Sequence, residues 1–370
     1  MFRKNSLGNP LVDGFIHALR RRMCNRPRDK VYAFYGLLGI IGFKLHSPEL
    51  ESTLGKVYHR FFYDLIVSDP SLIRLIMDVG SGKRDDINDA PTWVPAFNDF
   101  SSSWLDPDYF TRLHPCSAVL PFEGALSWYL ALRELLPQQE SRILAYSLSP
   151  PDFRRELKVM GVFQGTAPFC TASCERSSTL ERQISQGQQF IAWFRALRSM
   201  TFSGGPNASI PNAIFAVLQG RVTTLDERAP SPEARAFLTW FRDFNQGLES
   251  EMRTLPLTDA DIDVSDEFAG RLSTMSSSDY FVERCKGLAR AKRNLFVSSE
   301  GYLGSGPENM TSEDQIVLIA SVPVPMVLRK ASDGSGRYMV LGAAFVHGLM
   351  EAKGWKKGWK EEEIQKIILI

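Results

Sequence analysis

Cysteine is scarce in this sequence, with five thiols in 370 residues. A small and odd number of cysteines does not make a disulfide framework, so we expect reduced thiols and a cytoplasmic protein. An excess of charge of one sign is also lacking, because the sequence has 43 basic and 42 acidic residues. This balance gives no global field that would favour nucleic acid or an anionic membrane as a partner.

Long apolar runs are lacking as well. The longest apolar run without a charged residue covers residues 31–43. It is too short to span a bilayer, and we interpret it as a buried core segment. The N-terminus carries charges but no apolar stretch behind them, so we expect no signal peptide.

The composition that remains is that of a soluble globular chain, with 44% apolar and 23% charged residues. The length corresponds to two or three domains, or to one large irregular unit. The 24 Phe, 10 Tyr and 7 Trp residues predict extensive aromatic packing.

The first two thirds of the chain have mainly helical patterns. A helix with one wide apolar face is predicted after Thr53, from the spacing of Leu54, Val57, Tyr58, Phe61, Phe62 and Leu65. Ser231-Pro232-Glu233 combines an N-cap, a first-turn proline and an acid, which predicts another helix start. Further helices are expected near residues 72–77, 125–136 and 190–197, and a strand near 157–163.

The last hundred residues have strand-like patterns instead. The segments are residues 295–297, 316–319, 324–328 and 338–346, with a hairpin turn predicted at Asp333-Gly334-Ser335-Gly336. We therefore predict an α+β fold that is mostly α-helical in its N-terminal and middle parts. A small antiparallel β-sheet or barrel is expected near the C-terminus.

This pattern suggests four parts along the chain. They are a helical unit at 1–100, an irregular and helical middle region at 101–254, a polar connector at 255–278 and a β-rich unit at 279–370. The connector is rich in Asp and Ser, and we expect it to be partly disordered.

Motifs for chemistry are weak. Residues 80–83 read Gly-Ser-Gly-Lys, but Met77 and Arg84 break the phosphate-loop pattern. A zinc site could be assembled in principle from His114, Cys116, Cys170 and Cys174, but nothing ties the two pairs together. We therefore predict no cofactor and no metal.

His347 follows an apolar strand and could act as a general base, although a histidine at the edge of the core fits the pattern better. Residues 1–30 carry a local charge of +6, from eight basic and two acidic residues. Such a run can bind nucleic acid, but we interpret it as a solvated helix end because the rest of the chain lacks a basic face.

Three segments together resemble a known family. Residues 22–37 include Pro27-Arg28-Asp29-Lys30-Val31-Tyr32, residues 90–97 include Trp93-Val94-Pro95, and residues 294–350 hold a Gly-rich turn, Pro-Met-Val-Leu-Arg and Phe-Val-His-Gly. In order and spacing they are similar to fungal heterokaryon-incompatibility (HET) domain proteins, in the region downstream of the HET module. The S-Y-x-W-G-like and D-x-x-C-I-N-Q-like motifs of that module do not occur in this sequence.

The resemblance implies a role in fungal non-self recognition and programmed cell death. Because the effector motifs are missing, it implies a non-catalytic regulatory or recognition region that acts through a protein partner, without nucleic acid or membrane. The motif residues that we interpret as structural are Pro27, Arg28, Asp29, Lys30, Tyr32, Gly36, Trp93, Pro95, Gly304, Gly306, Pro307, Arg329, Gly342, His347 and Gly348.

These motifs also predict local structure. The segment at residues 31–38 should be a central helix that is buried on both sides, with Trp93 as a lid on it. Gly304 and Gly306 should adopt positive φ at a strand end. Arg329 should close the hairpin at Asp333.

Two other functions stay open at this point. One is a tailoring enzyme of a fungal secondary-metabolite pathway, with a pocket near His347, Arg329 or the cysteine group. The other is a nucleic-acid-binding module that uses the basic N-terminus.

Overall fold

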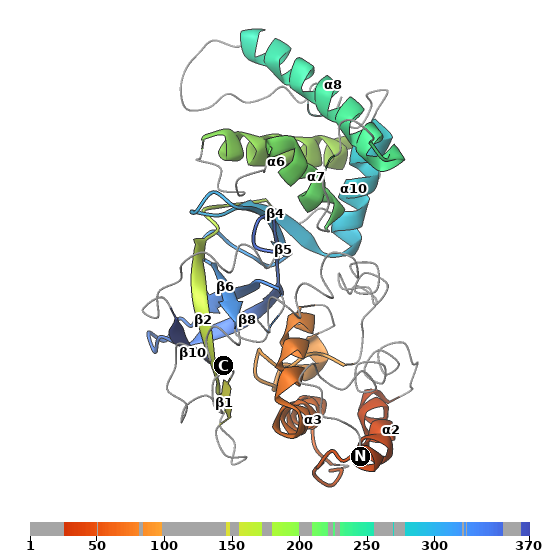
Figure 1. Cartoon of the computed structure of the whole chain (residues 1–370), viewed down its shortest axis with the longest axis vertical. Helices are drawn as coiled ribbons and strands as arrows, with labels where there is room; N and C mark the ends of the chain where they lie inside the picture. Colours follow the sequence, from red (N-terminus) through yellow and green to blue (C-terminus); the bar gives the residue numbers. More distant parts are fainter. Residues whose placement is uncertain are drawn as a thin grey trace. The chain divides into compact units, whose positions relative to one another are not determined.

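The computed structural model describes residues 26–49, 51–80, 84–97, 146–148, 155–171, 180–199, 209–220, 225, 230–254, 269, 278–319, 322, 324–350 and 364–370. The chain divides into two compact units. Unit one consists of Met1–Gly165, Asp314–Ala344 and Leu349–Ile370, and unit two consists of Thr166–Glu313 and Phe345–Gly348. Figure 1 shows the elements of both.

The helices of unit one come from its N-terminal part. Among the described residues they are α2 (Pro27–Ile40), α3 (Leu54–Ser68) and the 3-10 helices η1 (Pro70–Asp78) and η2 (Asp85–Ile87). The predicted helix after Thr53 is confirmed as α3, and the Thr53 side chain accepts a hydrogen bond from the backbone N–H of Lys56. The helix expected near 72–77 is η1.

The strands of unit one close into a barrel. They are β1 (Tyr146–Leu148), β2 (Leu157–Thr166), β6 (Gln315–Ile319), β7 (Met326–Lys330), β8 (Tyr338–Ala343) and β10 (Gln365–Leu369). The sheet order is β1-β2-β10-β8-β7-β6, and a further pairing of β2 with β6 closes it. Among the described strands of this sheet, closure leaves β1 outside the ring, and it removes the open edges of the ring strands that would otherwise favour aggregation.

The barrel interior is tightly filled. A methyl group on Gly161 of β2 would lie 2.7 Å from Ile367 Cδ1 and 2.8 Å from the carbonyl oxygen of Leu318. Between β7 and β8 the register shifts, so Val327 pairs with Gly342 and Leu328 with Val340. Leu341 is therefore the extra residue of a β-bulge, and Gly342 beside it has φ of 151°, which favours glycine.

Unit two packs helices on a second sheet. Its strands are β3 (Phe169–Cys170), β4 (Arg293–Val297), β5 (Leu303–Pro307) and β9 (Phe345–Val346), in the order β3-β4-β5-β9. Its described helices are α6 (Leu180–Ser199), α7 (Ile210–Gln219), α8 (Pro232–Thr254) and α10 (Ser278–Arg290). Helices α6 and α10 contact β4, and α7 contacts β5.

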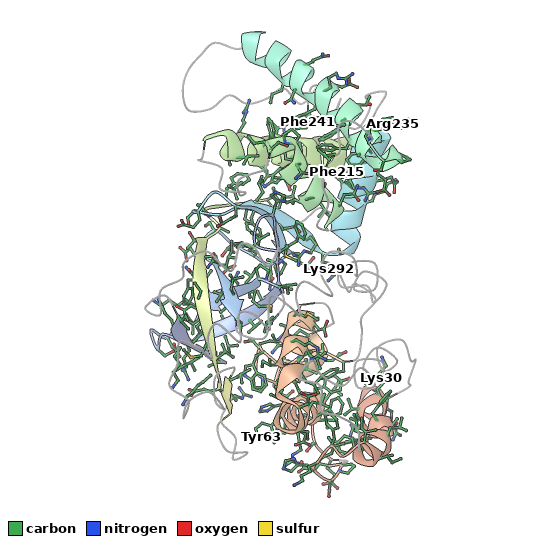
Figure 2. The ribbon with its side chains drawn as sticks, viewed as in Figure 1. Lys30, Tyr63, Phe215, Arg235, Phe241 and Lys292 are labelled. Carbon is green, nitrogen blue, oxygen red and sulfur yellow. The ribbon has the colours of Figure 1, made fainter. Side chains whose placement is uncertain are left out.

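The core of unit two is aromatic. Trp240 stacks on Phe244 at 5.5 Å between ring centroids, and Phe215 packs against Phe237 at 5.0 Å. Figure 2 shows Phe215 and Phe241 among the side chains of these helices. The predicted helix start at residue 231 is confirmed, because Ser231 Oγ accepts a hydrogen bond from the backbone N–H of Ala234.

The predicted α+β class, with antiparallel strands concentrated toward the C-terminus, is thus confirmed. The expected helix near 125–136 lies outside the described residues, as does nearly all of the connector at 255–278. The four-part division stays a prediction. Within the described part of the chain, no helix is long and apolar enough to cross a membrane.

Candidate functional site

The first family motif forms α2, and its residues explain where this helix begins and ends. Pro27 occupies the first helical position and Asp29 lies in the first turn, where an acid favours the helix dipole. At the other end Gly42 has φ of 95°. The N–H of Gly42 donates to the carbonyl of Gly39, and the N–H of Phe43 donates to that of Leu38. These two hydrogen bonds form a Schellman motif, which ends the helix.

The prediction that this helix is buried on both sides is wrong. Its buried residues are Lys30, Val31 and Leu38, whereas Leu37 is 44% and Ile40 is 82% exposed. Ala33 and Gly36 are exposed as well. The composition of the run suggested a core segment, but helical periodicity places part of its apolar residues on a side that no described residue covers.

We call the exposed stripe of Ala33, Gly36, Leu37 and Ile40 the α2 face. A methyl group added at Gly36 would meet nothing within 4 Å. Val67, near the C-terminal end of α3, is another exposed large apolar side chain, at 54%. Two large aliphatic side chains exposed on one helix make this stripe the candidate interaction surface of the described residues.

The inner side of α2 packs against α3. The hydroxyl of Tyr58 donates to the carbonyl of Pro27 over 3.3 Å. The ring of Tyr35 stacks on Phe61 with centroids 6.0 Å apart. Burial and the nearby Asp64 carboxylate raise the pKa of Tyr35, so it stays neutral. The α2 face is therefore presented by a preorganised helix.

Hydrogen bonds to α3 fix the loop that follows α2. His46 Nδ1 lies 2.5 Å from the buried carboxylate of Asp64, and the backbone N–H of His46 donates to the other oxygen over 2.8 Å. The backbone N–H of Lys44 donates to Ser68 Oγ. Sequence reasoning did not find this pair, because the two residues lie 18 positions apart and no short motif joins them.

The Trp93 motif packs on α3, so the prediction that Trp93 covers α2 is wrong. Its ring lies edge-on to His59, with centroids 5.0 Å apart, and Trp93 Nε1 donates to the carbonyl of Arg155. Burial, with the Arg155 charge, lowers the pKa of His59 to about 4. Pro95 is buried in the same segment.

Arg84 organises this loop, a role that sequence reasoning missed. Its guanidinium donates to four backbone carbonyls at 2.7–3.2 Å, those of Ala90, Pro91, Thr92 and Val94. Burial lowers its pKa. Thr92 in turn bonds to the backbone of Val340 and Ile370, which ties the loop to barrel strands β8 and β10.

The Gly-rich motif lies within β5, and the prediction of positive φ at Gly304 and Gly306 is wrong. Glycine is needed there for space. A methyl group on Gly304 would collide with the Phe296 ring and lie 2.6 Å from the carbonyl oxygen of Phe345. A methyl group on Gly306 would collide with the sulfur of Met310. Pro307 ends the strand.

His347 and Gly348 come directly after β9, which pairs with β5. The backbone N–H of His347 donates to the carbonyl of Leu303 over 2.8 Å. Gly348 has φ of 89°, which favours glycine. Burial lowers the pKa of the His347 ring to about 4, and the described residues give the ring no hydrogen-bond partner. The pairing of β5 with β9 thus brings the Gly-rich part and the Phe-Val-His-Gly part of the third family segment side by side.

Arg329 does not close the Asp333 turn. It makes a bidentate pair with Asp314, at 2.8 Å for both bonds, and Asp314 is only 1% exposed. This pair joins β7 to the start of β6, and its hydrogen bonds raise the pKa of Arg329. Asp333 is bonded to Ser335 and Arg337 instead, and these bonds lower its pKa.

Ligand-type side chains do not form a metal cluster among the described residues. Cys170 is not part of a disulfide, and its thiol donates to the carbonyl of Met310 over 3.5 Å. His114, Cys116 and Cys174 lie outside the described residues. Of the three places considered for an enzyme pocket, Arg329 is in unit one, and His347 and Cys170 are in unit two.

Comparison with protein-family models matches residues 223–362 to the Het-6 β-barrel domain. The match contains strands β4 to β9, whereas β2 and β10, which close the barrel, lie outside it. No curated protein and no solved structure gives a significant match. The resemblance that the sequence motifs suggested is confirmed for the matched region.

Proposed function

We propose that this chain, which carries the Het-6 β-barrel domain of a HET-related family, is a non-catalytic recognition region that binds a protein partner through the α2 face. The observation that carries the proposal is the exposure of Leu37 and Ile40 on a helix made of the family motif. Burying two such aliphatic side chains releases about 25 cal/mol for each Å² removed from water. Leu37 and Ile40 gain no such free energy while they stay in contact with water.

The contacts that fix α2 to α3 support this proposal. Its other side is fixed to α3 by the Tyr35–Phe61 stack and by the bond from Tyr58 to Pro27. A partner that docks on this face meets a helix already in its final position, so the entropic cost of binding is small. The barrel and the loop held by Arg84 then serve as the scaffold that carries the face.

In this proposal the biological role is fungal non-self recognition. The test expresses the full chain in a filamentous fungus and scores the death of fusion cells by dye uptake. We expect the double variant Leu37→Asp/Ile40→Asp to abolish the response, because two carboxylates would be buried unpaired in the interface. The matched control is Ala236→Asp, which adds a charge to an exposed position of α8.

Undiminished death with the double variant would refute the recognition role of the α2 face. A thermal melt of each purified protein separates this result from misfolding, since both substitutions are at exposed positions and should leave Tm within a few degrees of the parent. The alternative of a tailoring enzyme has its own test. It predicts turnover of a small molecule that the double variant retains.

A further inference from the structure

The order of side chains along the α2 face indicates what binds it. We infer that the face binds the same face of a second copy of this chain, as an antiparallel pair of α2 helices around a two-fold axis. This inference rests on the proposed function, because it identifies the protein partner of that surface. It is argued from the sizes and the charges of the exposed residues.

The side-chain sizes along the face are self-complementary. In an antiparallel pair centred between Gly36 and Leu37, each residue lies level with the one equally far on the other side of that centre. Ala33 of one copy is then level with Ile40 of the other, so a small side chain lies opposite one that is 82% exposed. The two Leu37 side chains meet beside the axis. A methyl group at Gly36 would touch nothing within 4 Å, so this position leaves room for a second helix.

The charges at the two ends of the face are complementary in the same arrangement. Asp29 is exposed and lies four residues before Ala33, on the same side of α2. Lys44 is exposed just after the other end of the helix, where its backbone N–H donates to Ser68 Oγ of α3. The antiparallel pair brings Asp29 of each copy to the end where Lys44 of the other copy lies. The two-fold axis makes this attraction occur twice.

A parallel pair of α2 helices is disfavoured by the same residues. It would bring Asp29 toward Asp29 and Lys44 toward Lys44, and like charges across an interface cost free energy. The helix dipoles add to the difference. In the antiparallel pair the positive N-terminal end of each helix lies beside the negative C-terminal end of the other.

The exposed charges beside the face are of both signs at each end of α2. They are Arg26 and Asp29 at the N-terminal end, and Lys44, Glu49 and Glu51 in the loop beyond the C-terminal end. Glu49 forms an ion pair with Arg60 of α3. This mixture selects neither a strongly charged helix nor an anionic membrane. It matches a surface that carries the same mixture in the opposite direction.

The size of the contact predicts a weak dimer. One helix face from each copy, with Leu37 and Ile40 as its large side chains, buries less than the roughly 1,200 Å² at which stable interfaces begin. We therefore expect a dissociation constant of about 10–100 μM. Such a dimer forms when the local concentration of the chain rises.

The test is sedimentation velocity of the full chain at concentrations from about 1 μM to about 300 μM. We expect the sedimentation coefficient to rise toward that of a dimer across this range. Leu37→Asp/Ile40→Asp should stay monomeric, because the pair would bury carboxylates, whereas Ala236→Asp should associate as the parent does. A parent chain that stays monomeric throughout would overturn the inference, and so would a dimer that the double variant retains.

An exchange of charges tests the antiparallel arrangement. Asp29→Lys and Lys44→Asp should each raise the dissociation constant about three- to tenfold, because two attractive contacts become repulsive. Asp29→Lys/Lys44→Asp restores opposite charges at both ends and should return the constant to within about twofold of the parent. A parallel pair has like charges facing each other in all four chains. Equal constants in the four chains, or a combined variant as weak as the single ones, would overturn the inference.

These results are separable from the test of the proposed function. Loss of cell death in Leu37→Asp/Ile40→Asp, from a parent chain that does not dimerise, would overturn the inference and leave the proposed function with another protein partner. A dimer that is lost in this variant without any loss of cell death would refute the recognition role and support the dimer. Binding of the parent to phosphatidylserine vesicles, lost in the same variant, would assign the face to a membrane and overturn the inference.

Discussion

Replacing Gly304 by alanine tests the explanation given for the Gly-rich family motif. The added methyl group would collide with the Phe296 ring and lie 2.6 Å from the carbonyl oxygen of Phe345, which belongs to the backbone of β9. A backbone group cannot move aside without shifting its strand. Overpacking of this kind costs about 1–3 kcal/mol, and we take the upper part of that range. The smaller entropy of the unfolded alanine chain returns about 0.4–1 kcal/mol. The net loss should be about 2 kcal/mol.

Gly306→Ala is the matched control. Its methyl group would collide with the Met310 sulfur and lie in ordinary contact, at 3.5 Å, with the Phe296 ring, and a thioether side chain can rotate away. The steric cost and the entropic gain should then cancel to within about 1 kcal/mol. Urea unfolding followed by tryptophan fluorescence measures both variants, with the slope m checked for constancy. Equal losses at Gly304 and Gly306 would refute the steric explanation.

Three other perturbations follow from the described contacts. The folded pKa values of His59 and His347 are about 4, against 6.5 for the unfolded ring. As pH falls, the unfolded chain therefore binds protons before the folded chain does. Each ring should lower the free energy of unfolding by up to about 3 kcal/mol between about pH 6.5 and about pH 4. A urea midpoint that stays constant across this pH range would contradict this. Arg84→Met should lower the free energy of unfolding by about 3 kcal/mol, because four backbone carbonyls lose their hydrogen-bond donors. A decrease below about 1 kcal/mol would show that water replaces the guanidinium as the donor. Arg329→Met should lower the free energy of unfolding by about 3–5 kcal/mol, because the buried Asp314 carboxylate loses its bidentate cation, and adding Asp314→Leu should recover much of that loss; a double variant less stable than the single one would contradict this reasoning.

The sequence predicted the elements whose signals are local. The apolar spacing after Thr53 and the cap at Ser231 both gave helix starts that the structure confirms. The strand segments near 316–319, 324–328 and 338–346 correspond to β6, β7 and β8. In each case the side-chain period or the cap acts within a few residues, so pattern and structure agree.

The predictions that failed concern contacts between distant residues. The spacing of the run at 31–43 cannot say which side of α2 meets α3, so Leu37 and Ile40 were assigned to the core. Gly304 is glycine because of Phe296 and Phe345, and the second of these lies 41 positions away in the sequence. Arg329 pairs with Asp314 rather than with its nearer neighbour Asp333. A single sequence holds no record of such pairings.

The barrel is closed by a strand that lies beyond the family match, which ends at residue 362. Strand β10, at Gln365–Leu369, lies between β2 and β8 and pairs with both. A chain that stops at residue 362 would leave those two strands with open edges facing each other across the gap. We expect amides of β2 and β8 to lose their protection from hydrogen exchange in that truncated chain. Amides of β4 and β5 belong to unit two and should keep theirs, which makes them the internal control. Retained protection in β2 and β8 would mean that the remaining strands close the ring without β10.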